Sequence, residues 1–256
     1  MSDQPFDVRG RVALVTGASS GLGDNFARVL SKGGATVAVA ARRADRLAAL
    51  VADLERAGGK ALAVSMDVSD PASVEAGLAA VVKAVGAPDI VVNNAGIAQT
   101  KPALQITESD WRDVMNTNLD GAWRVAQGSA KAMVAAGKGG SIINIASVLG
   151  LRVASNLLAY AAAKAALIQV TEALALEWAR YGIRVNAIAP GYIETEINRG
   201  FFRTEAGQAM VKRVPQRRIG TPSDLDGALL LLASDASGYM TGSTVVVDGG
   251  HVVNSL

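Results

Sequence analysis

Short runs rich in valine, isoleucine and alanine alternate along this chain with longer segments of helical periodicity. The apolar runs are residues 12–15, 36–41, 61–66, 90–92, 141–145, 183–188 and 244–247. Helical periodicity is found in residues 22–31, 45–57, 71–85, 111–136, 157–181 and 222–234. The runs are apolar throughout, which is expected of parallel strands that helices cover on both faces. The pattern predicts an α/β fold with about seven strands in a doubly wound parallel sheet and helices on both faces.

Nothing in the sequence divides the chain into parts. It has 256 residues, which suits one α/β domain. There is no internal repeat and no stretch rich in proline, serine or charge, so we expect a single domain over residues 1–256. The least regular segment, 191–221, follows the sixth apolar run and should lie on the ligand side of the sheet. We expect this segment to be a mobile lid over the substrate site.

Composition excludes several kinds of site and partner. The 25 Lys+Arg and 23 Asp+Glu give a net charge of +2, too small to indicate a nucleic-acid or membrane surface. There is no cysteine and one histidine, His251, so we expect no disulfide, no Cys nucleophile and no metal site. Residues 1–11 lack the apolar core of a signal peptide. The longest charge-free run, 139–151, is shorter than the roughly 20 apolar residues of a membrane helix. We therefore expect a cytoplasmic protein.

A glycine-rich turn directly follows the first apolar run and opens the first helical segment. Its glycines are spaced G-x-x-x-G-x-G. Such glycines let the backbone approach a pyrophosphate, whose charge is favoured at a helix N-terminus. The turn therefore predicts a Rossmann-type dinucleotide site, the alternative being a purely structural turn. The residues expected to contact the cofactor here are Gly17, Ser19, Ser20, Gly21, Leu22 and Gly23.

The residues after the second apolar run indicate which dinucleotide is bound. The run ends at Ala41 and is followed by Arg42 and Arg43. NAD sites carry an acid here that binds the ribose hydroxyls, and none is present. An arginine guanidinium suits the phosphate of NADP(H), so we expect NADP(H), with NAD(H) as the alternative. Two other interpretations remain: Arg42 stacks on the adenine of either cofactor, or both arginines are simply solvated.

Three side chains suited to acid–base chemistry should gather at the same edge of the sheet. Tyr160 and Lys164 are four residues apart on a helical segment, so they share one face. Ser147 lies just past the fifth apolar run. A nearby ammonium group favours the phenolate of a tyrosine, which makes Tyr160 a candidate acid–base group. The Ser147 hydroxyl could bind a substrate oxygen as negative charge develops on it.

With these motifs the chain resembles the short-chain dehydrogenase/reductase family, from about residue 11 to residue 250, and in particular its 3-oxoacyl reductase and glucose dehydrogenase-like members. The matching motifs, in order, are residues 16–23, Asn93-Asn94-Ala95-Gly96, Asn118, Ser147, Tyr160 with Lys164, Pro190-Gly191, and a tail containing Thr241-Gly242 and Asp248-Gly249-Gly250. Two positions depart from the family pattern, Ala163 before the lysine and Asp24-Asn25 after the glycine turn. Neither departure removes a catalytic group.

The resemblance implies a role for each site residue and a homotetrameric assembly. Tyr160 would give or take the proton, and Lys164 would lower its pKa and hold the nicotinamide ribose. Ser147 would orient the carbonyl, and Asn118 would hold a water in a proton relay to Lys164. The other residues implied to contact the cofactor are Asp67 and Val68 at the adenine, Asn94, Ala95 and Gly96 at the adenosine half, and Pro190, Gly191, Ile193 and Thr195 at the nicotinamide half.

These features predict an oxidoreductase that interconverts a ketone or aldehyde and an alcohol by hydride transfer with NADP(H). The alternatives are an NAD-dependent alcohol, sugar or polyol dehydrogenase and, in another class, a non-catalytic nucleotide-sensing protein. The candidate substrate-pocket residues are Ala98, Leu149, Leu151, Asn156, Tyr192, Phe201 and Phe202. Because most of them are apolar and no arginine clamp is evident, we expect a neutral or hydrophobic substrate.

Overall fold

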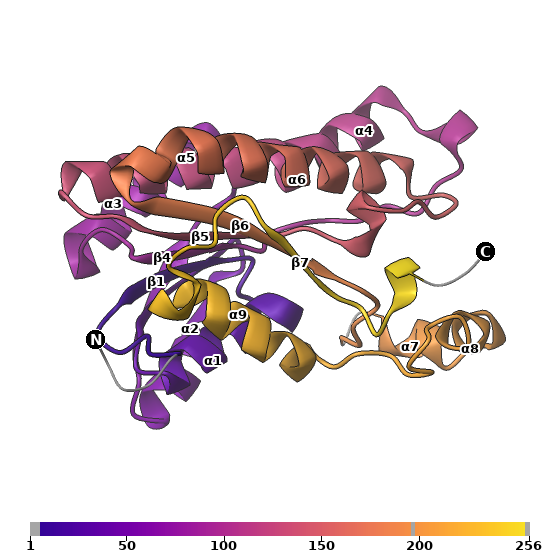
Figure 1. Ribbon diagram of the computed structural model, residues 1–256, viewed down its shortest axis with the longest axis horizontal. Coiled ribbons are helices and arrows are strands. Elements are labelled where there is room, and N and C mark those ends of the chain that lie inside the picture. Colours follow the sequence, from indigo (N-terminus) through magenta and orange to yellow (C-terminus); the bar gives the residue numbers. More distant parts are fainter. Residues whose placement is uncertain (1–5, 196–197, 254–256) are drawn as a thin grey trace.

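A parallel β-sheet forms the centre of the protein. The computed structural model describes residues 6–195 and 198–253. Within these ranges seven strands form one sheet in the order β3-β2-β1-β4-β5-β6-β7, and every neighbouring pair is parallel (Figure 1). The strands are β1 (Val12–Thr16), β2 (Thr36–Ala41), β3 (Lys60–Ser65), β4 (Ile90–Asn93), β5 (Gly140–Ile145), β6 (Ile183–Pro190) and β7 (Thr244–Val247). The order reverses between β1 and β4, which confirms the predicted doubly wound fold.

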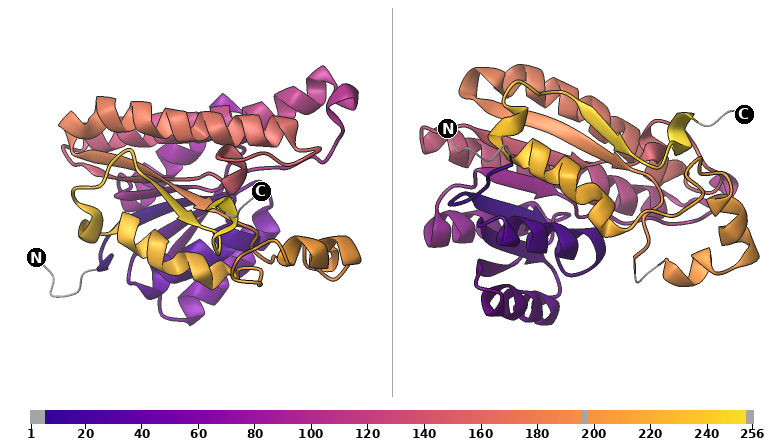
Figure 2. Two further views of the ribbon diagram at one scale, coloured as in Figure 1. Left: turned by 45° about the vertical axis from the view of Figure 1, so that its right-hand side comes forward. Right: turned by 60° about the horizontal axis from the view of Figure 1, so that its bottom comes forward.

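Helices cover both faces of the sheet (Figure 1). On one face lie α1 (Gly21–Lys32), α2 (Ala44–Arg56) and α9 (Asp226–Ala233). On the other lie α3 (Pro71–Val85), α5 (Gly121–Ala135) and α6 (Leu158–Trp178), with α4 (Glu108–Met115) beyond them. Two short helices, α7 (Arg199–Phe202) and α8 (Glu205–Val211), project from the body beyond the sheet (Figure 2).

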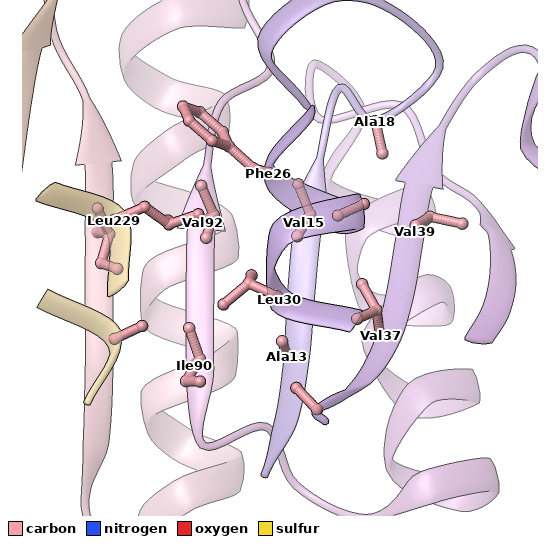
Figure 3. Packing of buried hydrophobic residues seen from close by; sticks show 14 of the residues in the cluster. Ala13, Val15, Ala18, Phe26, Leu30, Val37, Val39, Ile90, Val92 and Leu229 are labelled. Atoms are coloured by element: carbon pink, nitrogen blue, oxygen red, sulfur yellow. The ribbon is translucent and has the colours of Figure 1, made fainter. Parts of the chain in front are cut away.

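Each face of the sheet has its own apolar layer. In one layer Phe26 and Leu30 of α1 and Leu229 of α9 pack on strand residues such as Val15 (Figure 3). The neighbouring residue Leu14 points to the opposite layer, beneath α3, α5 and α6. Because successive strand residues face opposite layers, the strands need apolar residues at every position. This is why the strand sequences contain no alternation with polar residues.

Three segments differ from the sequence-based expectation. The helix expected over 111–136 is interrupted by a π-helical turn, Asn116–Asp120, between α4 and α5. Side chains support this wide turn, because Asn118 bonds the backbone of Ile97 and Arg124 donates to Asn116 Oδ1. The helix expected over 222–234 begins as a 3-10 turn, Pro222–Leu225. The segment 191–221, expected to be the least regular, contains α7 and α8.

One helix of the described chain is long and apolar enough to cross a membrane, judged by length and composition alone. It is α6 with its 3-10 continuation, Leu158–Tyr181. In this structure it packs along β5 and β6 and buries Lys164 and Thr171. A core helix of a globular fold meets the same length and composition criteria, so its apolar character follows from its place in the sheet–helix packing.

Candidate active site

The turn between β1 and α1 brings backbone close to the end of β4. Gly17 and Gly21 have positive φ angles, +65° and +59°. A Cβ atom on Gly17 would lie 2.8 Å from Ala95 Cα, so no other residue fits there without a shift. Asn94 Nδ2 donates to the carbonyl oxygens of Thr16 and Gly17, at 3.0 and 3.3 Å. These bonds hold the turn open at the N-terminus of α1, which has no side-chain cap and can bind an anion.

A cavity of about 460 Å³ extends from this turn past the carboxyl ends of β2, β3 and β4. It brings together most residues that the sequence analysis assigned to the cofactor: Gly17, Ser19, Ser20, Gly21, Leu22, Arg42, Arg43, Asp67, Val68, Asn94, Ala95, Gly96 and Thr195. Gly23 does not line it. A Cβ on Gly23 would lie 2.4 Å from the carbonyl oxygen of Gly17, so this glycine serves the packing of the turn. The sequence analysis missed Met66, Ile97 and Thr117, which carry no signal of their own.

The two arginines after β2 have different surroundings. Arg43 Nη2 donates to Ser19 Oγ and Ser20 Oγ, both at 2.9 Å, so its guanidinium lies over the glycine turn. Arg42 is exposed over 71% of its side chain, and its Nη1 lies 3.8 Å from Asp67 Oδ2. Burial raises the pKa of Asp67, but hydrogen bonds from Ser69 and the charge of Arg42 outweigh burial and lower that pKa overall. Two guanidinium groups therefore border the adenosine end of the cavity.

A second cavity, of about 380 Å³, adjoins the first. Leu22, Asn94, Gly96, Ile97 and Thr195 line both, so the two form one continuous groove. The second cavity also contains Ser147, Tyr160, Lys164, Pro190, Gly191 and Ile193. The residues expected at the adenosine half of a dinucleotide and those expected at its nicotinamide half thus lie one after the other along a single groove.

Ser147, Tyr160 and Lys164 meet where β5 ends and α6 begins. Lys164 is 4% exposed, and its Nζ donates to the carbonyl oxygen of Ile145 at 2.6 Å. This Nζ lies 5.7 Å from the ring centroid of Tyr160. Burial lowers the pKa of Lys164 to about 8. Burial also raises the pKa of Tyr160, which a hydrogen bond with Ser147 partly opposes. A phenol, a hydrogen-bonding serine and an amine therefore line the same part of the groove.

Asn118 lies behind this cluster and does not line either cavity. Its Oδ1 accepts from Ile97 N and its Nδ2 donates to the Ile97 carbonyl oxygen, both at 2.8 Å. A Cβ on Gly96 would lie 3.3 Å from Asn118 Oδ1 and 3.7 Å from Lys164 Nζ, so the two polar groups approach the same point. The structure thus assigns Asn118 a part in holding Ile97, and its role in a proton relay stays a prediction.

The predicted substrate-pocket residues separate into two groups. Ala98, Leu149 and Tyr192 line the second cavity. Leu151, Asn156 and Phe201 are exposed, and Phe202 is buried under Tyr192 with their ring centroids 6.2 Å apart. These four do not line the cavity in this structure, and their contact with substrate stays a prediction. The sequence analysis missed Leu157 and Asn198, which do line it.

The residues of the groove fit a dinucleotide. Glycines without Cβ atoms form the cradle, an uncapped helix N-terminus faces it, and arginines border one end while a buried amine lies at the other. A metal site has no support in the described ranges, where no group of three or more His, Cys, Asp or Glu could hold an ion.

Comparison with known proteins identifies the family of this chain. A family model described as enoyl-(acyl carrier protein) reductase matches residues 17–252. A short-chain type dehydrogenase/reductase from Mycobacterium marinum is 40% identical, with a TM-score of 0.91 over 96% of this chain and 97% of its own. The chain belongs to the short-chain dehydrogenase/reductase family. It is an oxidoreductase that acts on CH–OH and C=O groups.

Members of this family that resemble the chain differ in substrate. A gluconate 5-dehydrogenase from Burkholderia cenocepacia J2315, in complex with NADP and tartrate, is 39% identical with a TM-score of 0.94 over 98% of each chain. D-threitol dehydrogenase from Mycolicibacterium smegmatis (strain ATCC 700084 / mc(2)155) is 37% identical over 98% of this chain and 96% of its own. The name of the first relative indicates an acidic substrate, gluconate, and the name of the second indicates an uncharged polyol, threitol.

Proposed function

We propose that this protein interconverts an uncharged ketone or aldehyde and the corresponding alcohol with NADP(H). The convergence of Ser147, Tyr160 and Lys164 in a cavity continuous with the dinucleotide groove carries the proposal. When bound, NADP(H) supplies or accepts the hydride. The side chains of this protein supply the proton and the electrostatic stabilisation.

Tyr160 is proposed as the acid and base of the reaction. In reduction its hydroxyl gives a proton to the substrate oxygen, and in oxidation the phenolate takes it back. Burial alone raises the pKa of Tyr160 and would disfavour the phenolate. The hydrogen bond with Ser147 and the nearby ammonium of Lys164 favour it. With substrate bound, Ser147 donates its single hydroxyl proton to the substrate oxygen, where negative charge develops, instead of to Tyr160.

The proposed preference for NADP(H) rests on the end of β2. Ala41 occupies the position at which NAD sites carry an acid, and an acid there would repel a phosphate. Arg42 and Arg43 follow Ala41. Both arginines border the adenosine end of the groove, so either can meet a 2′-phosphate. The relative from Burkholderia cenocepacia, which shares this fold, has NADP in its structure.

The proposed lack of charge on the substrate rests on the cations near the second cavity. In the described part of its lining, Lys164 is the one cation, and it serves the catalytic cluster. Lys101, three residues after the lining residue Ala98, is bound to Asp110 with Nζ and Oδ2 2.5 Å apart. Arg213, whose charge acts on the lining residue Tyr192, does not itself line the cavity. Within the described lining a substrate carboxylate would therefore meet no cation except Lys164, whereas hydroxyl groups can bond to serine and asparagine.

A substrate panel tests this proposal. We expect neutral polyols such as threitol and glycerol, and simple ketones, to show a kcat/KM at least ten times that of gluconate. A Tyr160→Phe variant assayed on the same panel shows which signals belong to this site. Oxidation of gluconate as fast as that of any neutral polyol would contradict the proposed substrate class.

We also infer that residues 1–256 act as one domain and that the protein is a cytoplasmic homotetramer without nucleic-acid or membrane partners. Exposed apolar side chains on α5 and α6, namely Trp123, Val134, Leu158 and Leu176, support an assembly through these helices.

Segment 191–221 is proposed as the lid over the substrate site. Its two ends are paired, because Glu194 N donates to Gly220 O at 2.8 Å, and Gln216 N donates to Gly249 O at 3.1 Å. Hydrogen exchange in this segment should slow when cofactor and a competitive inhibitor bind.

A further inference from the structure

A row of buried polar side chains joins β4, β5 and α6 outside both cavities. Asn93 and Asn144 are register partners on neighbouring strands, and Asn93 Nδ2 donates to Asn144 Oδ1 at 2.9 Å. Asn144 Nδ2 in turn donates to Thr171 Oγ1 of α6, also at 2.9 Å. All three side chains are at most 3% exposed. We call these three residues the polar row.

The polar row lies within an apolar layer, where polar side chains are costly unless they are bonded. Leu174 and Ala175 of α6 and Ile142 of β5 belong to this layer. Apolar contacts are non-directional, so by themselves they allow a helix to shift along a sheet. A hydrogen bond has a narrow range of distance and angle, and a buried one left unmade is penalised. The bond between Asn144 and Thr171 therefore selects one position of α6 on β5.

This position matters because the same helix and strand carry the catalytic cluster. Lys164 lies seven residues before Thr171, which is two turns along the same face of α6. Its Nζ bonds the carbonyl oxygen of Ile145, the residue directly after Asn144. Ser147 follows two residues later. A shift of α6 would change the distances from Ser147 to Tyr160 and from Ile145 to Lys164.

We propose that Thr171, acting through Asn144, is a positioning residue that sets the place of Tyr160 and Lys164 relative to Ser147. The proposal rests on the proposed function, because it takes these three residues as the catalytic cluster. Thr171 touches neither cavity, so its effect has to pass through the position of the helix.

Thr171→Val tests the proposal, because it keeps the shape of the side chain and removes the hydroxyl. We expect kcat to fall at least tenfold, while KM and the Kd of NADPH, measured by fluorescence, stay within about twofold. The acid limb of alcohol oxidation should move to higher pH, since a weaker bond to Ser147 leaves burial to raise the pKa of Tyr160 further. The described titratable groups that line this cavity with Lys164 are Tyr160 and Tyr192. Tyr192 also contacts His251, with ring centroids 5.1 Å apart, and the charge of Arg213 acts on it. Because the variant and the wild type share these groups, the shift is read as the difference between their two pH profiles.

Two variants serve as controls. Thr171→Ser restores a hydroxyl and should recover kcat and the pH profile. Ser129→Ala removes another buried hydroxyl, on α5, whose Oγ makes no hydrogen bond with the described residues, and it should leave both unchanged. Thermal unfolding of each variant measures stability separately. If Thr171→Val is insoluble, Thr171→Cys takes its place, and a reduced kcat with a shifted profile is expected.

The outcomes separate this inference from the proposed function. The proposed function fails if the wild type shows no dehydrogenase activity, or if its activity is not abolished by Tyr160→Phe. If the wild type is active and the Thr171→Val or Thr171→Cys variant lowers the melting temperature but keeps the wild-type kcat and pH profile, the positioning role is wrong. It is also wrong if Thr171→Ser loses as much kcat as the variant without the hydroxyl.

Discussion

Replacing Gly23 by alanine tests the geometry of the β1–α1 turn. The added Cβ would lie 2.4 Å from the carbonyl oxygen of Gly17 and 2.6 Å from Asn94 Nδ2. These two atoms are themselves hydrogen-bonded at 3.3 Å, so neither can retreat unless the turn opens. Overpacking of this kind costs about 1–3 kcal/mol. At ~2–4 °C per kcal/mol for a chain of this size, the melting temperature should fall by roughly 2–12 °C.

The same change should weaken cofactor binding, because the opened turn no longer matches a pyrophosphate. A loss of about 1.4 kcal/mol raises the Kd of NADPH tenfold, and we expect an increase of about fivefold or more. Fluorescence titration with NADPH and thermal unfolding by circular dichroism measure the two effects.

Gly227→Ala is the matched control for Gly23→Ala. Gly227 is exposed on α9, and a Cβ there would meet nothing within 4 Å. Because alanine is the better helix former, this variant should gain up to about 1 kcal/mol and bind NADPH as the wild type does. A Gly23→Ala protein with the melting temperature and Kd of the wild type would refute the reasoning about the turn.

Three further predictions concern catalysis, acid stability and assembly. Tyr160→Phe should fold and bind NADPH normally while turnover falls about 10²-fold or more; turnover within threefold of wild type would remove Tyr160 from the mechanism. Hydrogen bonds from Lys101 and Thr107 lower the pKa of Asp110 to about 2, so the stability it contributes should be present above pH ~4 and lost as the pH falls towards 2. The free energy of unfolding, measured with urea, should fall less between pH 5 and pH 3 in Asp110→Asn than in the wild type. An equal fall in both proteins would contradict this prediction. Sedimentation at micromolar concentration should show an oligomer, and a stable 26.2 kDa monomer would contradict the assembly.

The sheet could be predicted because burial on both faces leaves a strong trace in the sequence. Residues 36–41 carry only one polar side chain, and β2 spans those same residues. The π-helical turn at Asn116–Asp120 has no comparable trace. It depends on Ile97, which lies 21 residues from Asn118 along the chain, and on Arg124. Contacts of this kind become visible only when the chain has folded.

The grouping of the candidate site was also predictable, whereas the direction of individual side chains was not. Ser147 lies two residues after β5, and Tyr160 lies in the first turn of the next long helix, α6, at the edge of the sheet that the carboxyl ends of the strands share. Arg42 and Arg43 are adjacent, and the local path of the chain after β2 decides that Arg43 faces the glycine turn. Likewise, its place in the segment after the sixth strand made Phe201 a pocket candidate, but in this structure α7 leaves it exposed.

The most direct test of the account is the ratio of kcat/KM for NADPH to that for NADH. The 2′-phosphate carries roughly 1.5–2 negative charges at pH 7, and one charge-assisted hydrogen bond to it is worth about 1.5–3 kcal/mol. We therefore predict a ratio of at least about ten in the wild type. Ala41→Asp combined with Arg42→Ala should reverse it, and Arg43→Ala measured separately shows the share of the second arginine. A wild-type ratio near one, with Arg42→Ala weakening both cofactors equally, would contradict the account.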